Sequence, residues 1–250
     1  MTPTALARRP RPLLCGHRGA AATHPENTLP SVEAALEAGC DAVEIDVHVT
    51  ADGRLAVIHD ATVDRTTHGH GDVGALTAAA LGGLDAGSRD GLAGVRVPLL
   101  DEVLEQCRDR ALVRVEVKAA IERWPDATAL VARAVERCGM RDAALLLAFD
   151  HRHLAAARDI APWLGRVVLC DSAPTDVAGL LEPLDAIALG PRWTAIDADL
   201  CTRVHVLGRD VVTWTVDDPA NAVRLAHAGV DVLITNDPAR IGPALHALRR

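Results

Sequence analysis

The stretch Leu13–Thr50 reads LLCGHRGAAATHPENTLPSVEAALEAGCDAVEIDVHVT and contains a strand, a helix and a second strand. The apolar runs Leu13–Gly16 and Ala42–Thr50 are typical of buried strands, and Thr28–Ala38 between them has apolar residues at helical spacing. Gly39 marks the end of that helix. A helix that connects two buried strands predicts that the strands lie parallel, with helices covering both faces of the sheet.

The same alternation continues along the chain. Further strands are predicted at Arg54–His59, Leu112–Val117, Ala144–Phe149, Arg166–Leu169, Asp185–Leu189, Val211–Val216 and Val232–Thr235. Further helices are predicted at Leu99–Cys107, Ala127–Cys138, Arg152–Asp159, Thr175–Leu181, Ala198–Leu207 and Pro219–Ala228. Because the chain has 250 residues and no linker rich in Pro, Gly or Ser, we predict one α/β domain, a (β/α)8 TIM barrel over residues 13–250, preceded by a short N-terminal arm, residues 1–12.

Nine predicted strands are one more than an eight-stranded barrel needs. Between Val49 of the second strand and Leu55 of the third lies only TADGR, residues 50–54. This segment is too short for a parallel crossover. The Asp-Gly pair in this segment is a hairpin signal, so we predict that Arg54–His59 pairs antiparallel with Ala42–Thr50 as an extra strand. A two-residue turn would place Asp46 directly opposite His59.

The segment Ala61–Pro98 is the longest irregular part of the chain and is rich in Gly, Asp and Thr. Connections of this length are usually functional insertions or lids. We therefore predict that residues 61–98 form a small insertion over the mouth of the barrel.

The composition argues against several classes of protein. A formal net charge of −8 and an aromatic content of 2% disfavour nucleic-acid binding, which needs a basic stripe or stacking platforms. No apolar run approaches the roughly 20 residues of a membrane span, and no apolar segment follows the N-terminal arginines, so we expect neither a signal peptide nor stable membrane association. The six cysteines include no CxxC pair and are expected to be free thiols in the reducing cytoplasm. The sequence does not indicate the oligomeric state.

The first strand ends in a Gly-flanked pair, His17 and Arg18. A histidine can move protons near neutral pH, and an arginine can bind two phosphate oxygens at once. The alternative interpretation is a surface turn with two incidental polar residues.

Carboxylates interrupt two otherwise apolar strands. Glu44 and Asp46 share one face of their strand, and buried carboxylates need a partner, either a hard cation such as Mg²⁺ or Ca²⁺ or arginine side chains. Glu116 and Lys118 share a face of a later strand. Glu116 could supply a third carboxylate and Lys118, the only lysine of the chain, could neutralise a phosphate oxygen, or the two could form an isolated ion pair.

Two further candidates lie at strand ends. His59 ends the hairpin strand and Trp214 lies on a late strand, although a lone tryptophan is more often a core residue than a ligand platform. Because chemistry in barrels collects at the carboxyl ends of the strands, all these residues together predict a site for a metal and a phosphate group.

Motifs along nearly the whole chain resemble those of the glycerophosphodiester phosphodiesterases and occur in that family's order. They are His17-Arg18-Gly19, Glu26-Asn27-Thr28, Glu44-Ile45-Asp46-Val47, Thr50 with Asp52-Gly53, His59-Asp60, Asp64-Arg65-Thr66-Thr67, residues 98–103 (PLLDEV), Glu116-Val117-Lys118 and Trp214-Thr215-Val216. The resemblance implies a (β/α)8 barrel that hydrolyses glycerophosphodiesters to glycerol 3-phosphate and an alcohol. It implies a Ca²⁺ or Mg²⁺ ion bound by Glu44, Asp46 and Glu116, and general acid–base catalysis by His17 and His59.

The resemblance also implies phosphate-binding roles for Arg18 and Lys118, and Trp214 is our third candidate for contact with the substrate. The chain departs from the family at Ala148, where Ser is frequent, and at Asp217, where Asn is frequent. Both departures bear on substrate preference more than on catalysis. Which histidine is the acid, and whether water or the glycerol 2-hydroxyl attacks first, stay open at this point.

Two other functions fit the same motifs. One is a phospholipase D-like activity on lysophospholipids, which an exposed apolar rim on Ala61–Pro98 would favour. The other is an inactive barrel that only binds phosphate or metal. Because Ala61–Pro98 contains few large apolar residues, we expect a small, water-soluble glycerophosphodiester as the substrate.

Overall fold

The structure, a computed structural model, describes residues 12–87 and 91–248. Most of the predicted N-terminal arm (residues 1–11) and residues 88–90 of the predicted insertion lie outside the described residues. The strands are β1 (Leu13–His17), β2 (Ala42–Val49), β3 (Leu55–Val57), β4 (Leu112–Val117), β5 (Ala144–Ala148), β6 (Gly165–Cys170), β7 (Ala188–Pro191), β8 (Asp210–Thr213) and β9 (Val232–Thr235).

Helices follow almost every strand of the described chain. The α-helices are α1 (Leu29–Glu37), α2 (Ala78–Gly82), α3 (Leu100–Cys107), α4 (Ala127–Arg137), α5 (His151–Ile160), α6 (Val177–Leu181), α7 (Ala198–Val206), α8 (Pro219–Ala228) and α9 (Pro238–Leu248). The short 3₁₀ helices are η2 (Val73–Ala75), η4 (Glu182–Leu184) and η5 (Trp193–Ala195).

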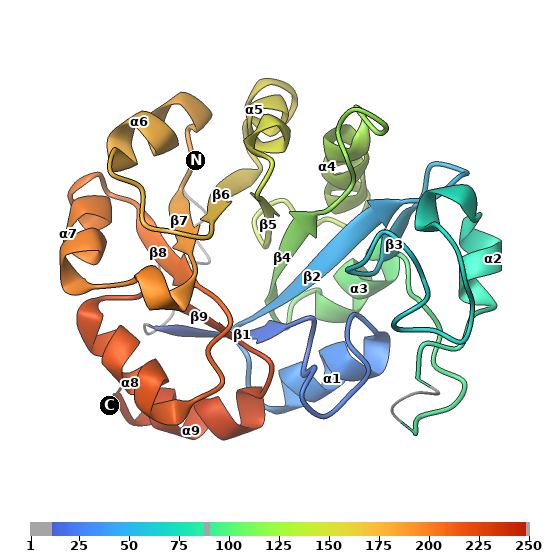
Figure 1. Cartoon of the computed structure of the whole chain (residues 1–250), viewed down its shortest axis with the longest axis horizontal. Helices are drawn as coiled ribbons and strands as arrows, with labels where there is room; N and C mark the ends of the chain where they lie inside the picture. Colours follow the sequence, from blue (N-terminus) through green and yellow to red (C-terminus); the bar gives the residue numbers. More distant parts are fainter. Residues whose placement is uncertain (1–11, 88–90, 249–250) are drawn as a thin grey trace.

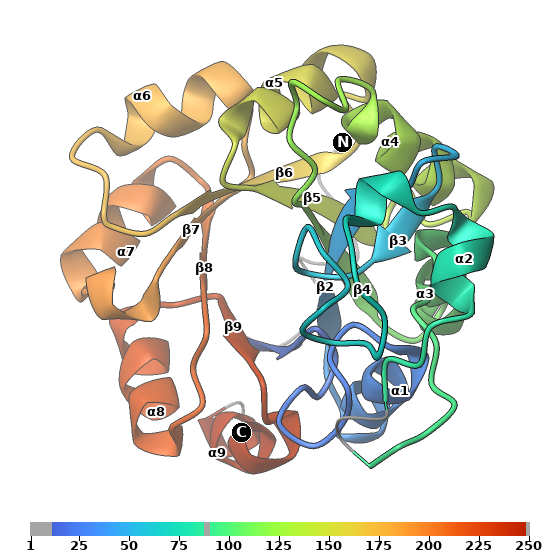
Figure 2. The same cartoon turned by 45° about the vertical axis from the view of Figure 1, so that its right-hand side comes forward.

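Eight of these strands close into a parallel barrel. Their hydrogen-bonded order is β1-β9-β8-β7-β6-β5-β4-β2, and β2 pairs back with β1. Figure 1 shows the helices wrapped around the strands, and Figure 2 shows the strands as an inner ring with α1 and α3–α9 outside it. The predicted (β/α)8 barrel is therefore confirmed.

Alternate residues of each strand face the barrel interior and the surrounding helices. On β1, Leu13 and Cys15 pack inside the barrel, whereas Leu14 between them packs against the helical layer. The period of two then points His17, the last residue of the strand, to the same inward side as Leu13 and Cys15. The alternation that builds the core therefore also delivers a polar side chain to the barrel mouth.

The extra strand β3 pairs antiparallel with β2, as predicted, but in a different register. Val47 pairs with Val57, so Asp46 lies opposite Ile58, whose N–H donates a hydrogen bond to the Asp46 carbonyl at 3.0 Å. The prediction that Asp46 lies opposite His59 is wrong by one residue.

The length of the turn causes this difference. The Thr50 N–H donates to the Arg54 carbonyl, which leaves three residues in the turn instead of two, and Gly53 takes the left-handed conformation (φ 71°) that such turns require. His59 reaches the barrel mouth because it lies beyond β3, where the chain is no longer bound to the alternation of the strand.

Other boundaries shift by a few residues. The strand predicted at Asp185–Leu189 starts only at Ala188, because Asp185 takes a left-handed conformation (φ 44°) that ends η4. The strand predicted at Val211–Val216 ends at Thr213. Helix α9 is not predicted from the sequence, because Pro243 interrupts its helical pattern.

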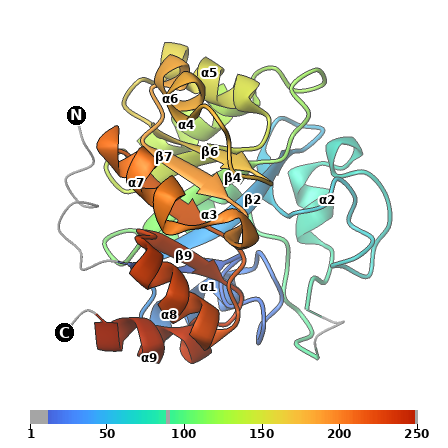
Figure 3. The same cartoon turned by 60° about the vertical axis from the view of Figure 1, so that its left-hand side comes forward.

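The described part of residues 61–98 has a small core of its own. Val63, Val73 and Leu81 pack with Ala56 and Ile58 of the hairpin. Figure 3 shows α2 on the right, the side toward which the strand arrows point. The segment is thus anchored on β3 near the mouth, and its action as a lid stays a prediction.

All six cysteines are free thiols, and all except Cys170 are buried. Among the described residues, no helix combines the length and the apolar character that crossing a membrane would take.

Candidate active site

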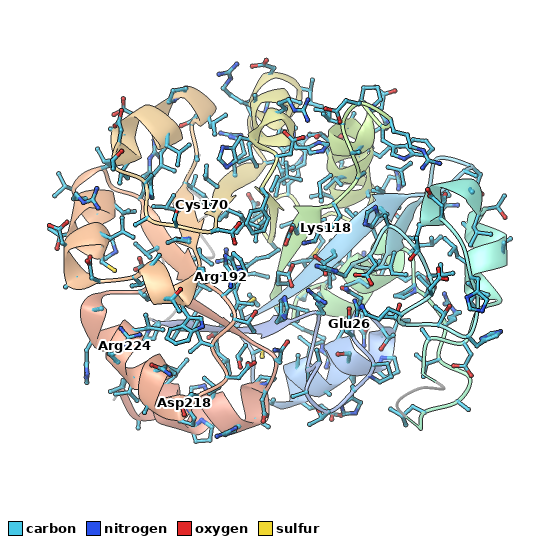
Figure 4. The ribbon with its side chains drawn as sticks, in the orientation of Figure 1. Glu26, Lys118, Cys170, Arg192, Asp218 and Arg224 are labelled. Atoms are coloured by element: carbon cyan, nitrogen blue, oxygen red, sulfur yellow. The ribbon has the colours of Figure 1, made fainter. Side chains whose placement is uncertain are left out.

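A cavity of about 120 Å³ lies at the carboxyl ends of the barrel strands. Its walls are formed by His17, Arg18, Glu44, His59, Glu116, Lys118, Leu147, Phe149, Leu169, Trp214, Thr215 and Ile234. Every site residue that the sequence predicts lines this cavity except Asp46, which lies nearby with 1% of its surface exposed. Figure 4 shows Lys118 near the centre of the molecule, within the ring of strands.

Strand register brings the three carboxylates together. Asp46 on β2 pairs with Glu116 on β4, and Glu44 pairs with His17 on β1. Residues paired in neighbouring parallel strands point to the same face, so all these side chains point into the barrel. One oxygen from each of Glu44, Asp46 and Glu116 lies within 4.8 Å of the others, a spacing that a metal ion could bridge.

The three carboxylates differ in their electrostatic environment. Burial, followed by the neighbouring carboxylate of Asp46, raises the pKa of Glu44 well above its usual value and that of Glu116 to about 7. Burial also acts to raise the pKa of Asp46, but the cations of Lys118 and Arg18 outweigh it and hold that pKa below its ordinary value.

The two predicted phosphate ligands are also ion-pair partners of these carboxylates. Lys118 Nζ lies 2.5 Å from Glu116 Oε1 and 3.4 Å from Asp46 Oδ1. Burial opposes the charge of Lys118, but these two carboxylates raise its pKa above the usual value. Arg18 Nε lies 3.2 Å from Asp46 Oδ2, and the Arg18 backbone N–H donates to Glu44 Oε2 at 3.2 Å.

A tight turn after β1 presents Arg18. Arg18 itself has a positive φ of 53°, and Gly19 follows with a φ of 87°. A Cβ atom on Gly19 would lie 2.4 Å from Ser31, so only glycine allows this turn to pack against α1.

His17 is held at its Nδ1 atom. This nitrogen lies 2.7 Å from Asn236 Oδ1, and the opposite nitrogen, Nε2, lies 3.9 Å from Glu44 Oε2. Burial and then the charge of Arg18 lower the pKa of His17, which favours the neutral ring.

His59 is held by a carboxylate instead. Its Nδ1 atom lies 2.6 Å from Asp60 Oδ1, and Arg65 donates from Nε to Asp60 Oδ2 at 2.6 Å. Arg65 also donates to both oxygens of Glu26, which in turn accepts from Arg18 at 2.8 Å. A continuous chain of charged contacts therefore links Arg18 to His59, and Figure 4 shows Glu26 of this chain below and to the right of Lys118.

Two aromatic rings also line the cavity. Trp214 and Phe149 lie edge to face with ring centroids 5.3 Å apart. The Trp214 Nε1–H donates to the Gly190 carbonyl at 2.9 Å, which fixes the indole, and Phe149 is 39% exposed. The cavity is thus lined by both apolar and charged side chains, and Lys118 Nζ lies 5.7 Å from the centroid of the Phe149 ring.

Several residues that shape the site have no predicted role. Asn27 donates from Nδ2 to Asp46 Oδ2 at 2.9 Å and accepts from the Asp46 N–H at 3.1 Å. Asn236, Asp60 and Arg65 hold the two histidines. These residues lie in loops, where no periodicity indicates which way a side chain points. The motifs at residues 26–28, 59–60 and 64–67 contain all of them except Asn236.

Residues 17–240 match the glycerophosphoryl diester phosphodiesterase family. The chain belongs to this family. A glycerophosphodiester phosphodiesterase of Caldanaerobacter subterraneus is 36% identical over 237 residues, covering 90% of this chain and 94% of the relative.

Solved structures agree with this family membership. A phosphodiesterase of Oleispira antarctica, determined in complex with the product sn-glycerol-3-phosphate, matches with a TM-score of 0.89 and 27% identity over 93% of this chain and 96% of its own. A glycerophosphodiester phosphodiesterase structure from Agrobacterium tumefaciens matches with a TM-score of 0.80 and 31% identity over 92% of this chain and 98% of its own.

Proposed function

We propose that this member of the glycerophosphodiester phosphodiesterase family hydrolyses small, water-soluble glycerophosphodiesters to sn-glycerol 3-phosphate and an alcohol in the cytoplasm, with a divalent cation and two histidines. The observation that carries the proposal is the meeting of three buried carboxylates, one lysine, one arginine and two histidines around one cavity. An anion site built directly upon a cluster of carboxylates suits metal-assisted hydrolysis of a phosphate ester.

The carboxylates suit a hard divalent cation, Ca²⁺ or Mg²⁺, held by Glu44, Asp46 and Glu116. Among the described residues, the buried atom Glu44 Oε1 accepts no hydrogen bond, and Asp46 Oδ1 has only its ion pair with Lys118 at 3.4 Å, an arrangement that a further cation would stabilise. Burial, and then repulsion by Asp46, raises the pKa values of Glu44 and Glu116, and a bound cation would offset both effects. A divalent ion bound there supplies Lewis-acid stabilisation of the charge on phosphate oxygens.

Arg18 and Lys118 would hold the phosphate group itself. Both border the cavity, and both already neutralise Asp46, so each lies between the acidic cluster and the place of the substrate. Three carboxylates, two cations and one divalent ion sum to a charge of about +1, which matches the single negative charge of a phosphodiester.

The two histidines would transfer the protons. Each ring has its Nδ1 atom engaged, His17 with Asn236 and His59 with Asp60, which leaves Nε2 for the reacting groups. One Nε2 would take the proton of the attacking hydroxyl as the new P–O bond forms, and the other would give a proton to the leaving alkoxide as the ester P–O bond breaks.

The described part of residues 61–98 supports a water-soluble substrate rather than a lysophospholipid. Leu92 is the only large apolar residue there that is exposed, at 40%. An apolar rim suited to an acyl chain would need several such residues together.

The direct test is the release of sn-glycerol 3-phosphate from the choline, ethanolamine, inositol and glycerol diesters by the purified protein. Phosphorus NMR during turnover separates the two attacking groups, because attack by the glycerol 2-hydroxyl produces a cyclic phosphate and attack by water does not. If the protein releases glycerol 3-phosphate from none of the four diesters in the presence of Ca²⁺ or Mg²⁺, the proposal is refuted.

A further inference from the structure

A chain of hydrogen bonds leads from the end of β8 across β9 to His17. The Val216 N–H donates to the Ile234 carbonyl at 2.9 Å and so holds the segment after β8 beside β9. Asp217 then accepts hydrogen bonds from the hydroxyl of Thr235 at 2.9 Å and from the backbone N–H of Asn236 at 2.7 Å. Its carboxylate is thereby fixed beside Asn236.

The charge of Asp217 decides how the Asn236 side-chain amide is turned. An ionised carboxylate only accepts hydrogen bonds, so the NH₂ group of Asn236 must face it, and Nδ2 donates to Asp217 Oδ2 at 2.7 Å. The amide oxygen, Oδ1, is then turned toward His17, 2.7 Å from its Nδ1 atom.

This orientation selects one form of the neutral histidine ring. The amide oxygen of Asn236 only accepts, so His17 Nδ1 must carry the hydrogen, and the lone pair of Nε2 points to the cavity. The neutral side chain of a free histidine in water prefers to carry its hydrogen on Nε2. The protein therefore imposes the less common tautomer on this ring.

We infer that Asp217 and Asn236 are positioning residues that act as a pair: Asp217 orients the Asn236 amide, and Asn236 holds His17 in the Nδ1–H tautomer, ready to accept a proton at Nε2. The inference rests on the proposed function, because it assigns an apparatus to one of the two histidines of that site. It also gives a role to Asp217, which differs from the Asn frequent at this position in the family.

The tautomer can be read without any measurement of activity. Long-range ¹H–¹⁵N NMR of the imidazole rings at about pH 8.5, where neutral imidazole dominates, distinguishes the Nδ1–H from the Nε2–H form. Comparison with His17→Gln assigns the His17 signals. We expect the Nδ1–H pattern in the wild-type protein, both with Ca²⁺ and in a chelator.

Two variants test whether Asp217 and Asn236 act together in setting the tautomer of His17. In Asp217→Asn an NH₂ group faces the NH₂ group of Asn236, so the Asn236 amide should turn over and His17 should move toward the Nε2–H form. In the double variant Asp217→Asn with Asn236→Asp, the amide at position 217 donates to the carboxylate at position 236. That carboxylate accepts from His17 Nδ1, so the Nδ1–H form should return.

Activity should follow the tautomer. Loss of the correct form forfeits part of a general-base contribution of about 10²–10⁴, so kcat of Asp217→Asn should fall at least about tenfold while KM changes little. The double variant should recover most of kcat. Asp218→Asn is the matched control, because exposed Asp218 only caps α8 at the Asn221 N–H and lies over that helix, far from Lys118 in Figure 4.

The outcomes distinguish this inference from the proposed function. A wild-type His17 in the Nε2–H form, or an Asp217→Asn variant with unchanged tautomer and kcat, would overturn the pairing even if the protein is active. A correct tautomer with no turnover on any diester would overturn the proposed function and leave the pairing supported. If Asp217→Asn fails to fold, the wild-type spectrum and the double variant decide the question.

Discussion

Asp46 on β2 lies directly opposite Glu116 on β4, with both side chains inside the barrel and almost fully buried. Burial, and then repulsion by Asp46, raises the pKa of Glu116 to about 7, although the ammonium of Lys118 is paired with both carboxylates. The acidic cluster is therefore electrostatically unfavourable until a cation binds.

In a chelator, Glu116 should make the protein less stable as the pH rises. Its pKa is about 7 in the folded protein against an ordinary value of 4.5, so the unfolded chain loses its proton first between these pH values. The stabilisation that protonated Glu116 contributes to the folded protein is complete below about pH 4.5. It is lost as the pH rises to about 7. The free energy of unfolding of Glu116→Gln, measured in urea, should therefore rise relative to wild type across this range, by at most about 3 kcal/mol.

A surface glutamate provides the control for this experiment. Hydrogen bonds from Arg110 and Gln106 lower the pKa of Glu33 to about 2, so its titration lies below this range. The difference in stability between Glu33→Gln and wild type should therefore change by less than about 0.5 kcal/mol from pH 4.5 to 7, because only the unfolded chain still completes its titration near pH 4.5. A difference for Glu116→Gln that is equally constant would contradict the raised pKa.

Lys118→Arg should lower activity although the charge is kept. Lys118 reaches Glu116 and Asp46 with a compact ammonium beside a cavity of about 120 Å³, where the planar guanidinium of arginine has different size and geometry. We expect a fall in kcat/KM of at least about tenfold, a loss of about 1.4 kcal/mol in transition-state binding. The exchange Arg203→Lys on α7, half-buried and outside the cavity lining, should leave kcat/KM unchanged, and full activity of Lys118→Arg would mean that a lysine is not required there.

Removal of either histidine ring should nearly abolish turnover. His17→Ala and His59→Ala each delete one proton-transfer group, so kcat measured with a glycerophosphodiester should fall by about 10²–10⁴. His227→Ala, on the exposed surface of α8, should retain the wild-type kcat. A near-normal kcat in His17→Ala or His59→Ala would remove that residue from the mechanism.

The fold and most of the site follow from the sequence because strands carry periodic information. The period of two places Glu44 with Asp46 and Glu116 with Lys118, and parallel barrel strands bring both pairs to one end. The position of His59 depends on one extra turn residue, which an Asp-Gly pair does not specify.

The loop residues that orient the site could not be placed in this way. Asn236 and Asp217 come from segments after two strands that are neighbours in space, and Asn27 bonds to Asp46 from a left-handed loop conformation (φ 58°). No pattern in the sequence indicates which of these side chains meet.

Gly19→Ala should destabilise the protein more than Gly53→Ala. Both glycines have positive φ, 87° and 71°, so both substitutions cost about 1–2 kcal/mol of backbone strain. Only at Gly19 would the new Cβ also lie 2.4 Å from Ser31, whereas nothing lies within 4 Å at Gly53. Urea unfolding should therefore show a loss for Gly19→Ala that is larger by at least about 1 kcal/mol, the order of the cost of overpacking. Equal losses would contradict the close packing of this turn.

The proposed activity requires a divalent cation held by Glu44, Asp46 and Glu116. The most direct test is the rate of sn-glycerol 3-phosphate release from one glycerophosphodiester by protein treated with EDTA, before and after addition of excess Ca²⁺ or Mg²⁺, with Glu44→Gln in parallel. We predict that EDTA abolishes release, that one of the two ions restores it, and that Glu44→Gln stays inactive at ion concentrations that saturate the wild type. Undiminished release in EDTA, or a fully active Glu44→Gln variant, would contradict the requirement for a cation at these carboxylates.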